Sequence, residues 1–249
     1  MPKKAVNPKF DDINISTKTI IGVSNINVNI EKIYEHINVV EYKVEEKKRG
    51  RRKKEAIKIE PIKLNEGDII NLKYQNNNKG VNLKKTNSKR FFRNALTVVM
   101  YINDKFINFK LSQNGKFQIT GSKKTENAIK CVKIFWDLIK NNNELYNYIG
   151  EPIFKVVFLT VMTNIDFNIG FNVDREKLDT YMNKFTEYNS LLEMSFGYTG
   201  VNIKFPLDNN LDFYLHRIIY NKDSNEWNKD TITYNEYLNG LSDADRKKQ

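Results

Sequence analysis

The residues of this chain that are best suited to chemistry are cationic, and many of them crowd into one stretch. Eight of the first twelve residues of KVEEKKRGRRKKEAIK, residues 43–58, are Lys or Arg. Such a run can bind nucleic-acid phosphates by displacing their counterions, or it can serve as a nuclear-targeting segment. The same composition is typical of a solvated loop without a ligand, so both interpretations stay open.

Residues suited to catalysis are scarce by comparison. The two histidines, His36 and His216, are too few for a histidine-based metal site or triad, and we expect structural roles for both. The single cysteine, Cys131, falls on the apolar face of an expected helix, as a small buried hydrophobe would in a reducing compartment. The sequence has no phosphate-binding glycine loop, dinucleotide-binding turn or paired-cysteine motif. We therefore expect no enzyme activity, no cofactor and no metal.

The charge of the 249 residues is strongly positive and unevenly distributed. The formal net charge is +11, but residues 1–150 hold 30 Lys or Arg against 15 Asp or Glu, whereas residues 151–249 hold 11 against 15. A polyanionic partner should therefore meet the first part of the chain. No apolar run is long enough to cross a membrane, and the N-terminus, MPKKAVNPKF, does not resemble a signal peptide. These features indicate an intracellular protein without membrane contact.

Hydrophobic periodicity predicts a first unit that positions these charges. In the first strand, Ile20, Ile26, Val28 and Ile30 share one face, which should be the core face. We expect residues 1–13 to form a flexible tail and residues 43–88 to form an irregular basic insertion. The predicted elements of this unit are strands at 17–30, 69–74, 95–103, 105–112 and 116–121, a short helix at 30–38 and a long helix at 124–141.

A second unit repeats this order. NINVNI at 25–30 and NIDFNI at 164–169 share four of six residues, and each ends a predicted strand before a helix. The sequence therefore divides into repeats at 14–150 and 151–240, followed by a tail at 241–249. The predicted elements of the second unit are a strand at 154–169, a helix at 175–188 and strands at 200–206, 212–221 and 230–238.

Several segments resemble the TATA-box-binding protein family. GKFQITGSKKTENAIKCVKIFWDLI, residues 115–139, carries the Gly-Lys and Thr-Gly corner that this family places before a long basic helix, as Gly115-Lys116-Phe117, Thr120-Gly121 and Lys123. NSKRFFRNALTVVMYI (87–102) looks like the family's N-P-K-R-F segment, and FKVVFLTVMTNIDF (154–167) resembles the opening of its second repeat. The composition and the basic insertion look most like the factors of large nucleocytoplasmic DNA viruses.

The resemblance implies an α+β fold of the TATA-box-binding protein type. Two pseudo-repeats of strand, helix, three strands and helix would form a saddle, one curved antiparallel sheet of about ten strands with helices on its convex face. Its concave face would bind the minor groove and bend the duplex with apolar wedges. The residues that strand parity and the resemblance assign to this DNA-binding face are Thr17, Thr19, Ile21, Phe91, Phe92, Phe109, Leu111, Gln118, Thr120, Phe158, Thr160, Phe196, Thr231 and Thr233. Those assigned to phosphate binding are Lys89, Arg90, Arg93, Lys116 and Lys123.

These assignments imply a function and leave alternatives. The expected protein is a transcription initiation factor that binds double-stranded, AT-rich promoter DNA, with a factor-IIB-like protein and RNA polymerase as partners. Its expected location is the host cytoplasm, at the sites of viral replication, or the virion or the nucleus. The outward residues could instead be only solvent-facing, and the phenylalanines could be rim packing. The fold could also serve as a protein–protein scaffold with weak DNA binding, which the acidic second unit favours, or as an accessory domain of a nucleic-acid enzyme.

Overall fold

The computed structural model describes residues 14–42, 63–83, 93–192, 200–205 and 213–241. The chain divides into two compact units. Unit 1 comprises residues 1–166 and 214–249, and unit 2 comprises residues 167–213. The predicted division at residue 150 concerns internal repetition rather than compactness, and it stays a prediction.

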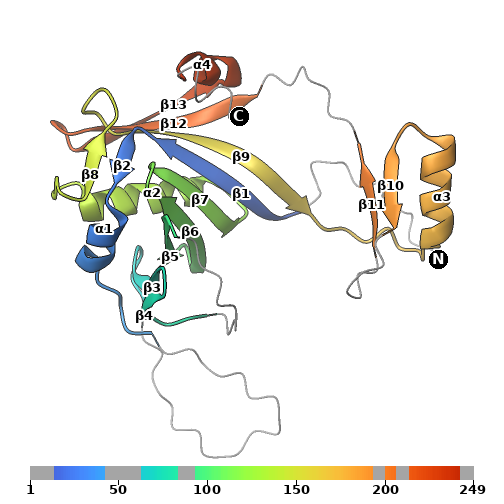
Figure 1. Cartoon of the computed structure of the whole chain (residues 1–249), viewed down its shortest axis with the longest axis horizontal. Coiled ribbons are helices and arrows are strands. Elements are labelled where there is room, and N and C mark those ends of the chain that lie inside the picture. The colour runs from blue at the N-terminus through green and yellow to red at the C-terminus, as the bar shows by residue number, and fades with distance from the viewer. Residues whose placement is uncertain (1–13, 43–62, 84–92, 193–199, 206–212, 242–249) are drawn as a thin grey trace, which may run out of the picture. The chain divides into compact units, whose positions relative to one another are not determined.

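Unit 1 is built on one antiparallel sheet of nine strands, in the order β13-β12-β9-β1-β7-β6-β5-β3-β4 (Figure 1). This sheet and its few helices agree with the predicted α+β class. Its strands are β1 (Ile15–Ser24), β3 (Ile69–Tyr74), β4 (Asn77–Gly80), β5 (Ala95–Ile102), β6 (Lys105–Ser112), β7 (Lys116–Ser122), β9 (Lys155–Ile165), β12 (Tyr214–Asn221) and β13 (Glu226–Thr233). The helices of unit 1 are α1 (Ile30–His36), α2 (Thr125–Ile139) and α4 (Tyr234–Asn239).

Tight turns set the register of the three consecutive strands β5, β6 and β7. Asn103 and Asp104 join β5 to β6 with φ angles of 47° and 58°, the left-handed values that a two-residue hairpin turn requires. Gly115, with φ of 70°, ends the turn between β6 and β7. The three strands match the predicted ranges to within one residue.

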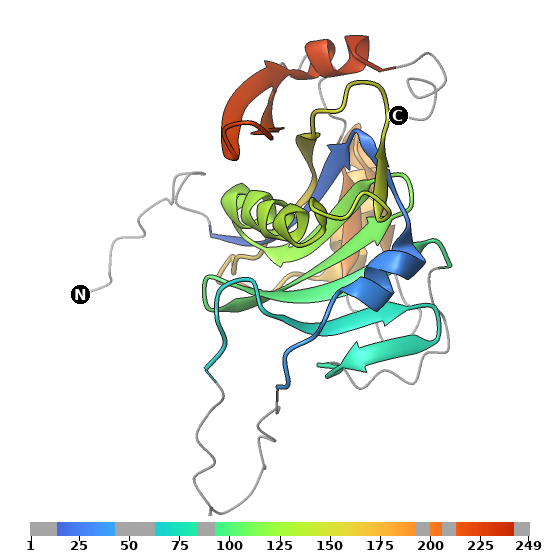
Figure 2. The same cartoon turned by 90° about the vertical axis from the view of Figure 1, so that its left-hand side faces the viewer.

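Helix α2 packs on one face of the sheet and forms the core with it (Figure 2). Phe135 meets Phe109 and Phe117 edge-on, with ring centroids 5.5 and 5.8 Å apart. Trp136 stacks on Phe154 at 3.9 Å between centroids. Aromatic rings in these geometries add to the free energy gained by burying their area. The helix therefore fixes which side of each strand is the core side.

Strand β1 lies between β7 and β9 and ends earlier than predicted. The predicted strand 17–30 is interrupted at Asn25, whose side-chain amide donates to the Ile153 carbonyl (2.8 Å) and accepts from the Lys155 amide (2.8 Å). Beyond Asn25 the chain pairs as β2 (Ile26–Val28) with β8 (Tyr146–Tyr148), in a separate two-stranded sheet. The expected core residues Ile20, Ile26 and Val28 are nevertheless buried, which confirms that prediction.

The end of the chain differs from the predicted strand at 230–238. Strand β13 stops at Thr233, and α4 follows at once. Thr233 and Glu236 form a reciprocal capping box, in which the Thr233 hydroxyl accepts from the Glu236 amide and the Glu236 carboxylate accepts from the Thr233 amide. This local arrangement satisfies two amides that a helix start leaves without partners, so it stabilises a helix where alternation suggested a strand.

The described residues of unit 2 form a helix, α3 (Arg175–Phe185), and a pair of antiparallel strands, β10 (Asn189–Leu192) and β11 (Val201–Lys204). No residue of α3 is buried. Phe167, Phe171, Phe185 and Phe205 are each more than 60% exposed. In the part of the chain that the structure describes, no helix is long and apolar enough to span a membrane.

Candidate nucleic-acid interface

The side of the nine-stranded sheet opposite α2 is called the open face here. Along β6, Ile107, Phe109 and Leu111 are buried in the core, and the residues between them, such as Asn108 and Lys110, point to the open face. Cross-strand register extends this face to the neighbouring strands, because directly paired residues lie on the same side of a sheet.

A hollow of about 580 Å³ lies on the open face. Hydroxyl and amide side chains dominate its lining, together with a few apolar side chains and one cation, Lys73. Neutral donors and apolar surface in one shallow depression can contact the edges of bases, which present both acceptors and apolar atoms. The lining residues are Thr17, Thr19, Asn71, Lys73, Asn82, Leu83, Thr97, Val99, Phe106, Asn108, Thr120, Gly121 and Met162.

Two rows of paired residues cross the open face. In the first, Val99 pairs with both Asn71 and Asn108, and Asn108 pairs with Thr120. In the second, the order from β3 to β9 is Lys73, Thr97, Lys110, Gln118, Ile21 and Leu159. The second row becomes apolar toward β9, and its polar and cationic residues lie on β3, β5, β6 and β7.

Hydrogen bonds hold part of the hollow in place. The Asn71 side-chain amide donates to Asn78 Oδ1 at 2.9 Å, and Asn71 is only 4% exposed. The Thr120 hydroxyl donates to the Asn108 carbonyl at 3.2 Å. A buried amide with a partner stabilises the local fold, whereas the half-buried Asn108 and Thr97 side chains offer polar atoms to a ligand.

Cations lie both within the open face and at its ends. Lys110 is half-buried, and this burial lowers the pKa of its ammonium group. Lys116 begins β7 and Lys123 follows its last residue, and both side chains are exposed. A strand of this length separates its ends by about 20 Å, so the two lysines lie at opposite margins of the sheet.

Several residues predicted for the DNA-binding face lie on the open face. Thr17, Thr19 and Thr120 line the hollow. Ile21 and Gln118 are paired with each other in the second row. Whether these residues contact DNA stays a prediction.

The placement of Phe109, Leu111 and Phe158 on the DNA-binding face is wrong. All three are at most 2% exposed and belong to the core beneath α2. The apolar residues of β6 have to face α2, because the residues that alternate with them include Asn108 and Lys110, and burying these polar side chains would cost free energy.

The same error of parity affects other residues of the second predicted repeat, residues 151–240. Thr160 pairs with Ile20, a core residue, so it lies on the helix side of β9 although it is exposed. Thr231 pairs with His216, which pairs with Phe158, so Thr231 is also on that side. Thr233, two residues further along β13, uses its hydroxyl to cap α4.

Of the predicted phosphate-binding residues, Arg93, Lys116 and Lys123 are exposed. Lys89, Arg90, Phe91, Phe92 and Phe196 lie outside the described residues, as do residues 43–62 and 84–88 of the predicted basic insertion.

Sequence reasoning missed several residues of the open face. Asn71, Thr97, Val99, Asn108 and Lys110 were not among the predicted contacts. The alternation in KFINFKLS contained the signal, because Asn108 and Lys110 share a parity opposite to that of Ile107, Phe109 and Leu111. Assigning the more apolar parity to the core would have placed them on the open face.

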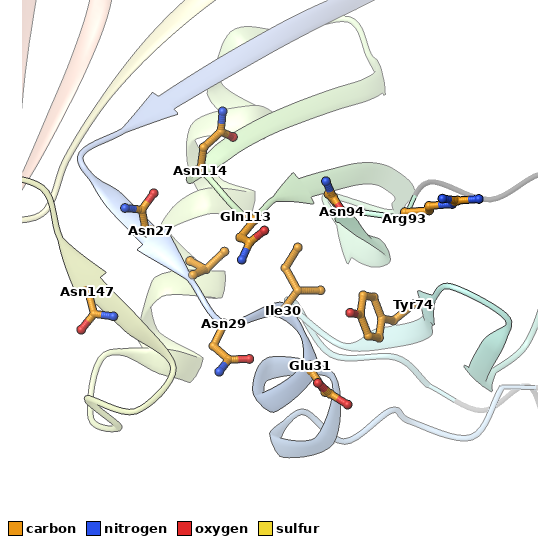
Figure 3. Close-up of a pocket in the computed structure, with 11 residues that line it drawn as sticks. Asn27, Asn29, Ile30, Glu31, Tyr74, Arg93, Asn94, Gln113, Asn114 and Asn147 are labelled. Atoms are coloured by element: carbon orange, nitrogen blue, oxygen red, sulfur yellow. The ribbon is translucent and has the colours of Figure 1, made fainter. Parts of the chain in front are cut away.

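A second hollow, of about 650 Å³, lies at the end of the sheet near the start of α1 (Figure 3). In Figure 3, Gln113, Ile30 and Tyr74 are directed toward its middle, whereas Arg93 extends away from it. Most of its other lining side chains are uncharged amides, including Asn94. This chemistry suits an uncharged polar group better than a polyanion.

The other reactive side chains of the described residues have the surroundings of structural residues rather than those of a catalytic or metal site. No group of three His, Cys, Asp or Glu side chains among them could hold a metal ion. Cys131 is 1% exposed, as expected, and burial raises the pKa of its thiol to about 12. His216 Nδ1 is buried without a hydrogen-bond partner in the described part of the chain.

Comparison with known proteins yields a viral relative. A protein of Acanthamoeba polyphaga mimivirus named "TATA-box-binding protein-like" is 28% identical to this chain over 178 residues. The match covers 59% of this chain and 48% of the mimivirus protein, so the chain spans about half the length of that relative. No family model matches the chain, and no solved structure does. The similarity agrees with the resemblance to the TATA-box-binding protein family at a coarse level.

Proposed function

We propose that this protein is a non-enzymatic transcription initiation factor of the TATA-box-binding protein type. The open face of its nine-stranded sheet would bind the minor groove of AT-rich promoter DNA and bend the duplex. One observation carries the proposal: a polar and apolar hollow covers several strands on the side of the sheet opposite the helices. The similarity to a protein named TATA-box-binding protein-like supports it.

The chemistry of the open face fits the floor of the minor groove. An A·T pair presents only the acceptors adenine N3 and thymine O2 there, and a side-chain amide such as that of Asn108 can donate to them. Val99 and Phe106 provide apolar surface in the same hollow. Opening the groove costs free energy in lost base stacking, and contact with a broad sheet can offset that cost.

The proposal includes a saddle made of two pseudo-repeats. Its support is the antiparallel pairing of β1 with β9, the first strands of the two repeated segments, inside the sheet. A factor-IIB-like protein and RNA polymerase would join the complex on DNA. The proposed location is the host cytoplasm, the virion or the nucleus.

An isosteric pair of variants tests the interface. Asn108→Asp places a negative charge in the hollow, and Asn147→Asp places the same charge beside the amide hollow of Figure 3. Fluorescence anisotropy with AT-rich and GC-rich duplexes, over a salt series, measures affinity. A probe of end-to-end distance measures bending. We expect Asn108→Asp to weaken binding to the AT-rich duplex roughly tenfold or more, because like charges repel, and Asn147→Asp to leave it unchanged.

The wild-type measurements decide between the possible interfaces. Preference for the AT-rich duplex, a bend and a steep salt dependence would support the proposal. Equal binding to straight duplexes of both compositions would refute it. If Asn147→Asp alone weakened binding, the interface would be at the amide hollow instead.

A scaffold that binds proteins is the second candidate, and unit 2 favours it. This unit has four Lys or Arg against seven Asp or Glu, and those of its phenylalanines that the structure describes are largely exposed. An acidic unit with exposed aromatic side chains suits contact with a basic protein surface better than contact with DNA. Absence of duplex binding at low salt would favour this alternative.

A further inference from the structure

The open face is covered at its β12–β13 end, outside the hollow. His216 pairs with the core residue Phe158, so its neighbour Leu215 points to the open face. Leu215 is nevertheless only 3% exposed, and it does not belong to the main core cluster. On the α2 side of the same strand, Tyr214 is 71% exposed. At this end of the sheet, therefore, the open face is the covered side.

Helix α4 is the described element that lies next to this covered side. It begins directly after β13, whose Ile232 pairs with Leu215. In Figure 1 and Figure 2, α4 lies beside β12 and β13 and away from α2. Tyr237 of α4 is 6% exposed and, like Leu215, lies outside the main core cluster. The position of α4 and the burial of these two side chains indicate that α4 covers this end of the open face.

The charged side chains at this end interact with one another. Arg217 also points to the open face, because its partner Val157 alternates with core residues, and its Nε donates to Asp230 Oδ1 at 3.0 Å. The pKa of the Glu236 carboxyl on α4 is lowered, first by hydrogen bonds from Thr233 and further by the charge of Arg217. These side chains carry more negative than positive charge, so with α4 in place this end does not attract a phosphate.

Helix α4 is held by few interactions. It has six residues, which is shorter than helices that are stable alone, and its stability depends on the capping box and on packing. Tyr237 is its one buried residue. No residue of α4 belongs to the main core cluster. The helix can therefore leave the sheet without opening the core, as a locally unfolding segment does.

We propose that α4 competes with DNA within the chain: it covers the β12–β13 end of the open face, and a duplex that spreads over the whole sheet displaces it. This inference rests on the proposed function. Only molecules with α4 displaced would bind the duplex fully, so the apparent Kd rises as their fraction falls. Loosening α4 should therefore strengthen DNA binding, which is the opposite of the effect of losing a DNA contact.

A pair of variants on α4 tests this inference in the full-length chain. Tyr237→Ala removes the buried side chain of α4, whereas Asn235→Ala changes an exposed residue of the same helix. Anisotropy measures the affinity of each for an AT-rich duplex, and thermal unfolding checks that each is folded. Amide hydrogen exchange of the wild type, with and without saturating duplex, follows the Gly240 amide, which donates to the Glu236 carbonyl at 3.1 Å.

We expect Tyr237→Ala to bind the duplex about fivefold more tightly or better, because it raises the fraction of molecules with α4 displaced. Asn235→Ala should bind as the wild type does. In the wild type, the duplex should speed exchange of the Gly240 amide, because this hydrogen bond is lost when α4 unfolds. The exchange measurement needs no variant, so it decides even if Tyr237→Ala does not fold.

The failures are distinguishable. Absence of duplex binding by both the wild type and Tyr237→Ala would overturn the proposed function. Duplex binding with unchanged affinity of Tyr237→Ala and unchanged exchange at Gly240 would overturn only the role of α4. Weaker binding by Tyr237→Ala, together with slower exchange at Gly240 in the complex, would make α4 part of the interface and would also overturn the competition.

Discussion

At the scale of single residues, Gly115 fixes the conformation of the turn between β6 and β7. Its φ of 70° ends the turn between β6 and β7, and its carbonyl accepts from the Ser24 hydroxyl at 2.7 Å. A side chain at this position would collide with the Ile26 carbonyl and with the Ser24 hydroxyl. The turn therefore requires glycine at the first position of the motif Gly115-Lys116, independently of any contact with DNA.

We predict that Gly115→Ala lowers the free energy of unfolding by about 2 kcal/mol or more, from backbone strain and from the collision. Gly150→Ala is the matched control, because Gly150 also has a positive φ, of 82°, but no atom lies within 4 Å of the added Cβ. Its cost should be about 1 kcal/mol, from strain alone. Urea denaturation of both variants measures the difference, and equal costs would mean that the Gly115 turn can relax.

At the scale of elements, α2 determines which side of the sheet is open. Phe135 is fully buried against Phe109 and Phe117, whereas Leu138, three residues along the same helix, is 42% exposed. We predict that Phe135→Ala costs about 3–5 kcal/mol of stability and that Leu138→Ala costs under about 1 kcal/mol. Thermal or urea unfolding tests this, and similar costs would contradict packing of α2 through its Phe135 side.

The contrast between β6 and its prediction shows what sequence could and could not decide. The ranges of β5, β6, β7 and α2 were predictable, because turn residues and periodicity are local signals. The face of β6 was misassigned, since Phe109 and Leu111 were placed on the DNA side although the residues that alternate with them, Asn108 and Lys110, are the polar ones. Burial under α2 depends on tertiary packing, and the alternation of apolar and polar residues in β6 indicates it correctly.

Strand β9 was harder to predict for a different reason. In FKVVFLTVMTNIDF both parities are apolar, so the sequence did not indicate which side of β9 faces the core. The bulge between Thr19 and Ile20 then moves Met162 to the hollow while Thr160 remains on the other side. A bulge changes the face of every residue beyond it, and alternation cannot locate it.

At the scale of the whole molecule, the two units differ in how they are stabilised. Every residue of the main core cluster belongs to unit 1, and the described residues of unit 2 contribute none. Continuing the register of β12 with β9 places Tyr214 opposite Thr160, five residues from Ile165, or about 17 Å along the strand. A flexible linker of about ten Gly and Ser residues spans that distance.

We therefore predict that replacing residues 167–213 by such a linker leaves unit 1 folded. Its free energy of unfolding should equal that of the full chain or exceed it by about 1 kcal/mol, since a shorter loop costs less entropy to close. Circular dichroism and urea denaturation measure this. Loss of cooperative unfolding would mean that unit 2 completes the core of unit 1.

The pairing of β1 with β9 has a consequence for how the chain is made. Strands β5, β6 and β7 follow one another and can pair as soon as they emerge, and β1 can join β7 soon afterwards. The other edge of β1 waits for β9, which ends at Ile165, 43 residues after the end of β7 at Ser122. At ordinary rates of synthesis the wait is about 2–9 s, long compared with hairpin formation. During that interval the unpaired edge of β1 is exposed. Nascent chains on neighbouring ribosomes of one mRNA can then pair through this edge and aggregate.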